Sequence, residues 1–108
     1  MSNPPESLAN SFIDHLTYER RLSPLTCTSY ARDIGIFLKS LNSRDLAHVQ
    51  MITIRQMIAQ LHGKGLSSKS LSRMLSAWGG FYRYLISGHH FQHNPCNGVG
   101  GPKSTQKL

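Results

Sequence analysis

A series of cations and small polar residues recurs at helical spacing in the second half of the chain. Lys69, Arg73 and Arg83 are interleaved with Ser72 and Ser76. At 100° of rotation per residue, these five side chains lie on one side of a helix. Cations and hydroxyls are the groups that commonly bind the phosphate oxygens and base edges of nucleic acids. The spacing therefore predicts a helix face that binds a polyanion.

Two adjacent glycines, Gly79 and Gly80, lie in the same stretch. Each glycine in a helix interior costs roughly 1 kcal/mol relative to alanine, so the pair needs a structural reason. One interpretation is close approach of the helix backbone to a nucleic-acid duplex. The alternative is a kink or a tight crossing with a neighbouring helix. The sequence favours neither interpretation of the glycine pair over the other.

A second, weaker polar face precedes the first. Its members lie opposite the apolar residues of the stretch 24–41 and are Thr28, Ser29, Arg32 and Lys39. Hydroxyls and cations together suit phosphate contacts, although an ordinary solvated face is the simpler interpretation. Ile36 also points outward in this arrangement, which favours a contact with another domain or subunit.

Apolar residues at a helical period predict four main helices and no strand, and hence an all-α domain. We expect the helices over residues 5–20, 24–41, 53–62 and 67–86. Ser23 suits the N-cap of the second helix and Pro24 its first position, and Thr53 is expected to cap the third. Trp78 falls within the apolar stripe of the fourth helix, which predicts a core residue.

The charge of the chain is distributed unevenly. The 108 residues carry a net charge of +7, and every acidic residue lies within the first 45 positions. A one-sided positive field indicates a polyanionic partner, more often nucleic acid than an anionic membrane. No apolar run is long enough to cross a membrane. Cys27 and Cys96 show no paired spacing, so we expect two free thiols and a cytoplasmic protein.

Three ordered blocks of the sequence resemble one family. The blocks are Leu22–Thr26 with Tyr30, Arg32–Asp33 and Phe37–Leu38; Gly65–Leu71 with Arg73, Leu75–Ala77 and Phe81–Leu85; and Asn94–Pro95 with Gly98–Val99 and Pro102–Lys103. They are similar to the "LSPxTxxxYxRDLxxFxxFL", "GLSxxSxxRxLSAxRxFYxxL" and "NPxxGVxxPK" patterns of Xer-type tyrosine recombinases of the phage integrase family, with XerC the nearest subgroup. The chain departs from the second pattern at Gly79, where the family usually has arginine.

The resemblance implies a four-to-five-helix SAM-like core-binding domain over residues 1–94, followed by a linker over 95–108 towards a catalytic domain. It implies that the second and fourth helices face double-stranded DNA, and that the fragment alone is a monomer. In a full-length recombinase, XerD-like protomers would complete a tetramer on DNA that resolves chromosome dimers during segregation and cell division. The predicted DNA-binding residues from the two faces and the resemblance are Thr26, Thr28, Ser29, Arg32, Lys39, Ser68, Lys69, Ser72, Arg73, Ser76 and Arg83.

No residue is predicted to be catalytic, because the tyrosine nucleophile of the family belongs to the other domain. The stretch 89–93 with Cys96 is rich in histidine but matches no zinc-site spacing, so no metal and no cofactor are expected. Two alternatives stay open. One is a phage or integron-type integrase domain, and the other is a helical protein-interaction module that organises the recombinase tetramer. We also expect Lys69 and Arg73 to be replaceable without unfolding the domain.

Overall fold

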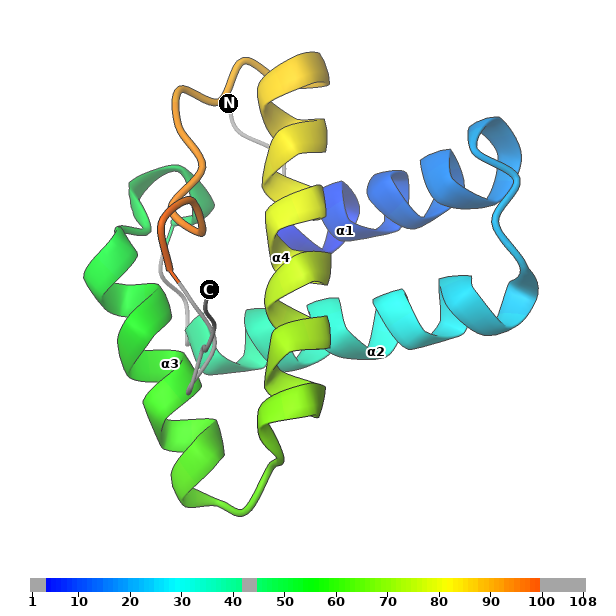
Figure 1. Ribbon diagram of the computed structural model, residues 1–108. Helices are drawn as coiled ribbons and strands as arrows, with labels where there is room; N and C mark the ends of the chain where they lie inside the picture. Colours follow the sequence, from blue (N-terminus) through cyan, green and yellow to red (C-terminus); the bar gives the residue numbers. More distant parts are fainter. Residues whose placement is uncertain (1–3, 42–44, 100–108) are drawn as a thin grey trace.

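The computed structural model describes residues 4–41 and 45–99, and within them all regular structure is helical. The α-helices are α1 (Pro5–Asp14), α2 (Pro24–Leu41), α3 (Met51–Gly63) and α4 (Ser68–Gly88). A π-helical turn, His15–Glu19, continues α1, and a 3-10 turn, Leu46–His48, precedes α3. Helix α4 crosses both α1 and α2, while α3 runs beside it (Figure 1). The predicted all-α fold is confirmed.

The apolar side of α4 is the centre of the core. Trp78 is fully buried, as predicted, and its ring lies 5.0 Å from that of Phe37 in α2. The indole Nε1 of Trp78 donates to the backbone carbonyl of Asp33 at 2.9 Å. Tyr82 is also buried, and its hydroxyl donates to the carbonyl of Leu46 at 2.8 Å. Without these bonds, the polar atoms of the two large rings would be buried with no hydrogen-bond partner.

The predicted starts of two helices are confirmed. Helix α2 begins at Pro24, and the hydroxyl of Ser23 accepts from the amide of Thr26 at 3.2 Å. Helix α4 begins at Ser68, with the Ser67 hydroxyl accepting from the amide of Ser70 at 3.1 Å. Each hydroxyl satisfies an amide that has no partner within the helix.

The prediction that Thr53 caps the third helix is wrong. Helix α3 begins two residues earlier, at Met51, and its N-cap residue is Gln50. The backbone carbonyl of Gln50 accepts from the amides of Thr53 and Ile54, which places Thr53 inside the first turn. A short apolar start, Met51–Ile52, therefore joins the helix without a hydroxyl cap.

The first helix is also less regular than predicted. The α-helical pattern stops at Asp14, and the amide of Arg20 bonds to the carbonyl of His15, five residues back, at 3.0 Å. Arg21 then adopts a positive φ of 54°. The wider turn and this left-handed residue direct the chain into α2.

The segment after α4 folds back over the domain. Asn94, Pro95 and Cys96 are buried, and Val99 packs against the core. The amide nitrogen of Asn94 donates to the carbonyl of Gly79 at 3.3 Å. The packed part of the chain thus reaches at least residue 99, beyond the predicted boundary after residue 94; the rest of the predicted linker lies outside the described residues.

Candidate nucleic-acid interface

Four of the predicted contact residues on α4 form an exposed polar stripe. Lys69, Ser72, Ser76 and Arg83 are all exposed, and among the described residues none of the four forms an ion pair. The neighbouring Ser68, at the first position of α4, is half-buried. The stripe combines unpaired cations with short hydroxyls, an arrangement that can follow a phosphate backbone.

The predicted residues of α2 differ in how free their side chains are. Arg32 and Lys39 are exposed cations, and Ser29 is half-buried. Thr28 is exposed, but its hydroxyl donates to the carbonyl of Pro24 at 2.9 Å. The hydroxyl of Thr26 accepts from that of Ser23 at 2.9 Å. Arg32 and Lys39 are therefore the α2 groups best able to bind an anion.

Arg73 differs from the other cations because it forms an ion pair. Its Nε and Nη2 atoms donate to the two carboxylate oxygens of Asp33 at 3.2 and 3.1 Å. Asp33 is fully buried, whereas 49% of the Arg73 side chain is exposed. The hydrogen bonds and the negative charge of Asp33 raise the pKa of Arg73 above its ordinary value. Loss of Arg73 would leave this buried carboxylate without its partner, so its replacement is expected to cost stability. That the domain stays folded when Lys69 and Arg73 are replaced remains a prediction.

The structure gives the glycine pair packing neighbours within the domain. A Cβ atom on Gly79 would lie 3.8 Å from the Cβ of Cys96, and one on Gly80 would lie 3.8 Å from the ring of Phe12. Gly79 is buried beneath the returning segment, and Gly80 faces α1. These are ordinary contact distances, so the packing does not itself require glycine at either position. Close approach to a duplex therefore stays a prediction.

Replacing Gly79 with alanine is expected to raise the free energy of unfolding by about 0.5–1 kcal/mol. The methyl group would make only ordinary contacts, and alanine favours the helix by roughly this amount. Urea denaturation measures the change. Gly65→Ala is the control and should destabilise, because Gly65 has a φ of 103° that alanine adopts only with strain. A loss of stability in Gly79→Ala would show that the packing there is tighter than the structure indicates.

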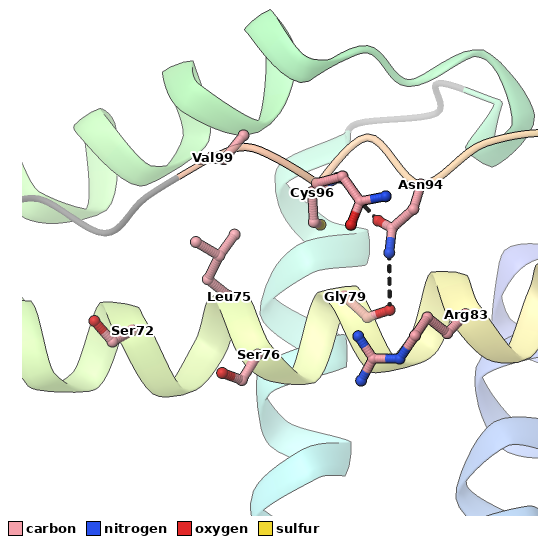
Figure 2. Close-up of a pocket in the computed structure, with 9 residues that line it drawn as sticks. Ser72, Leu75, Ser76, Gly79, Arg83, Asn94, Cys96 and Val99 are labelled. Atoms are coloured by element: carbon pink, nitrogen blue, oxygen red, sulfur yellow. Dashed lines mark hydrogen bonds between the residues drawn. The ribbon is translucent and has the colours of Figure 1, made fainter. Parts of the chain in front are cut away.

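A groove of about 280 Å³ lies between α4 and the segment that follows it, residues 94–99. Figure 2 shows Arg83 lying along α4 beside Gly79, with Cys96 and Asn94 across the groove. Its lining residues are Ser72, Leu75, Ser76, Gly79, Arg83, Asn94, Cys96, Asn97 and Val99. Burial raises the pKa of the Cys96 thiol to about 12, so this thiol stays protonated and is a poor nucleophile at neutral pH.

The tyrosines lie in different environments. Tyr82 is buried, and burial raises the pKa of its phenol. Tyr84 is half-buried and hydrogen-bonds to the Ser11 hydroxyl, whereas Tyr18 is 74% exposed. Over residues 4–41 and 45–99 no three His, Cys, Asp or Glu side chains gather where they could hold a metal ion. No helix of the described chain is both long and apolar enough to traverse a bilayer.

One sequence-based argument for a protein contact is wrong. Ile36 was expected to point outward, but it is half-buried and packs against the core. Among the residues that the structure describes, the most exposed large apolar side chains are instead Tyr18 and Leu25, which flank the turn between the π-helical segment and α2.

Comparison with known proteins identifies the family. The profile of the phage integrase, N-terminal SAM-like domain matches residues 9–89, from α1 to just past α4. The chain belongs to this family. The resemblance found in the sequence motifs is thereby confirmed, and the SAM-like domain is the four-helix unit described above. No solved structure matches the chain significantly.

Curated relatives carry recombinase names. The SAM-like domain is 41% identical to tyrosine recombinase XerC 1 of Ralstonia nicotianae, over 97% of this chain and 33% of that protein. It is 39% identical to tyrosine recombinase XerC of Ralstonia pickettii, over 96% of this chain and 33% of that protein. It is 37% identical to tyrosine recombinase XerC of Pseudomonas aeruginosa, over 92% of this chain and 34% of that protein. The chain thus spans about one third of the length of these relatives.

Proposed function

We propose that this SAM-like domain binds double-stranded DNA through α2 and α4, as the core-binding part of a XerC-like site-specific tyrosine recombinase. The observation that carries the proposal is the exposed polar stripe of α4, together with the exposed cations Arg32 and Lys39 of α2. The absence of acidic residues after position 45 supports it, since nothing in the second half of the sequence opposes a polyanion. The names of the curated relatives fit a role on DNA.

In this proposal the domain supplies DNA binding and not bond cleavage. We assign no catalytic residue, metal or cofactor to the chain, and place the chemistry in another part of a full-length recombinase that acts with XerD-like protomers in a tetramer. Resolution of chromosome dimers during segregation is the corresponding biological role. The free, buried thiols of Cys27 and Cys96 fit the reducing cytoplasm.

Contact with a neighbouring recombinase protomer is the second candidate function. Tyr18 and Leu25 favour it, because they are 74% and 82% exposed and both lie near the turn into α2. Scattered apolar residues are common on surfaces, so this contact is proposed as an addition to DNA binding. Binding through apolar residues would respond little to salt, which separates it from phosphate contacts.

The proposed function is tested by NMR titration of the isotope-labelled chain with a short duplex that carries a Xer-type core site. We expect shift changes clustered on residues 26–39 and 68–83 that fade as salt rises. The same titration with added unlabelled domain, without DNA, tests the protomer contact around Tyr18 and Leu25. An absence of DNA-induced shifts at low salt would overturn the proposal.

A further inference from the structure

Asp33 is a charged residue in an otherwise apolar place. It lies on the side of α2 that meets α4, is fully buried, and is next to the core residue Ile34. Its backbone carbonyl accepts from Trp78 and its carboxylate accepts from Arg73. A buried carboxylate is costly to place in a small core unless it is paired. Its location therefore calls for an explanation beyond holding two helices together, which apolar side chains would do as well.

The geometry of the ion pair leaves one edge of Arg73 free. A guanidinium has five N–H donors in a fixed plane. Asp33 uses one on Nε and one on Nη2. The three others, two on Nη1 and one on Nη2, have no protein acceptor in the described part of the chain. With 49% of the side chain exposed, this second edge can meet a ligand.

We propose that Asp33 is a positioning residue that holds the Arg73 guanidinium so that its free edge binds two adjacent acceptors on duplex DNA. The acceptors are two phosphate oxygens or the N7 and O6 atoms of a guanine, both of which fit this donor pair. The proposal rests on the proposed function and gives Arg73 a different role from the other cations of α4. Lys69 and Arg83 are unpaired and can follow the backbone, while Arg73 is fixed before DNA arrives.

Because the guanidinium is already fixed in the free protein, DNA binding costs less side-chain conformational entropy. It also reverses the expected effect of one substitution. Asp33→Asn removes a negative charge, so long-range electrostatics alone predicts tighter binding to DNA. If Asp33 positions Arg73, the same substitution weakens binding. The sign of the change therefore separates a positioning role from a merely structural one.

The test measures affinity for a labelled duplex with a Xer-type core site by fluorescence anisotropy, at a temperature where circular dichroism shows each variant to be folded. Asp33→Asn is expected to bind roughly ten-fold more weakly than the wild type. The matched control is Asp14→Asn, which removes an exposed acid at the end of α1 and should bind at least as tightly as the wild type. A folded Asp33→Asn variant with unchanged or tighter binding would overturn the positioning role.

A second variant keeps the test decisive if Asp33→Asn does not fold. Arg73→Lys retains the charge and can still pair with Asp33, but it lacks the second donor edge. We expect it to bind more weakly than the wild type, and wild-type affinity would overturn the proposal. A wild-type chain that fails to bind at low salt would instead overturn the proposed function itself.

The two kinds of acceptor are separated by sequence and salt. If the free edge binds a phosphate, Arg73→Gln weakens binding to core and shuffled duplexes equally and lowers the salt slope by about one. If it binds guanine, the loss is confined to the core-site duplex and the slope is unchanged. Either pattern is compatible with positioning by Asp33. An Arg73→Gln variant with full affinity for both duplexes at both salt concentrations would exclude it.

Discussion

Arg73→Ala is expected to lower the free energy of unfolding by about 3 kcal/mol, a large loss for a surface substitution. The substitution leaves the Asp33 carboxylate buried and without its partner, and breaking such a pair typically costs 3–5 kcal/mol. The lower end applies because half of the Arg73 side chain is exposed, so water can enter when it is removed. Urea denaturation followed by circular dichroism and by the fluorescence of Trp78, the single tryptophan, measures the change.

Two further variants make this prediction specific to the ion pair. Arg83→Ala is the matched control, because Arg83 is an exposed cation of the same helix, and its effect should stay within about 0.5 kcal/mol. Adding Asp33→Asn should destabilise the wild type but restore stability to Arg73→Ala, since an unpaired amide is cheaper to bury than an unpaired carboxylate. If Asp33→Asn destabilises both backgrounds equally, the two residues are not coupled.

Local chemistry explains which parts of the fold could be predicted from the sequence. The start of α2 at Pro24 and the burial of Trp78 follow from a capping serine and an apolar period, both of which lie within one helix. The π-helical turn after Asp14 could not be found in this way, because its apolar positions fit an ordinary helix equally well. Likewise, nothing local shows that Gln50 rather than Thr53 is the N-cap residue of α3.

The candidate site was predictable as a face but not as a set of contacts. The helical wheel placed Lys69 and Arg73 together, yet the structure separates them: one is unpaired and the other binds a carboxylate 40 residues away in sequence. A signal was present, since Asp33 lies within the apolar positions of α2, between Tyr30 and Phe37. An acid in such a place rarely stays unpaired. The identity of its partner, however, depends on how α2 and α4 cross.

The packing of Gly79 is another contact that the sequence of one helix could not predict. Its place on the wheel favoured contact with DNA as much as with protein. The segment that covers it comes from beyond the end of α4, in a stretch rich in loop-forming residues that the sequence assigned in part to a linker. The bond from Asn94 to the Gly79 carbonyl and the burial of Cys96 show that this stretch returns to the helix.

The strongest effect on DNA binding is expected from a triple variant, Arg32→Ala, Lys69→Ala and Arg83→Ala. All three side chains are exposed on α2 and α4, and each is expected to neutralise one phosphate. Because the slope of log affinity against log salt is about 0.9 per phosphate, the variant should lose roughly 2.7 from that slope. Over a four-fold rise in salt, from about 50 to about 200 mM, the wild type should therefore lose roughly 40-fold more affinity than the triple variant.

A second triple variant controls for net charge. Arg20→Ala, Arg55→Ala and Lys64→Ala remove three exposed cations that lie outside α2 and α4, so both triples change the net charge from +7 to +4 (7 − 3). If DNA lies along α2 and α4, the control keeps more of the wild-type slope than the first triple does, because cations outside these helices neutralise fewer phosphates. Equal losses in the two triples would mean that binding follows the overall charge and that the face has been misplaced. A loss confined to the first triple would place the duplex against the exposed polar stripe of α4, next to the Arg73 edge that Asp33 holds.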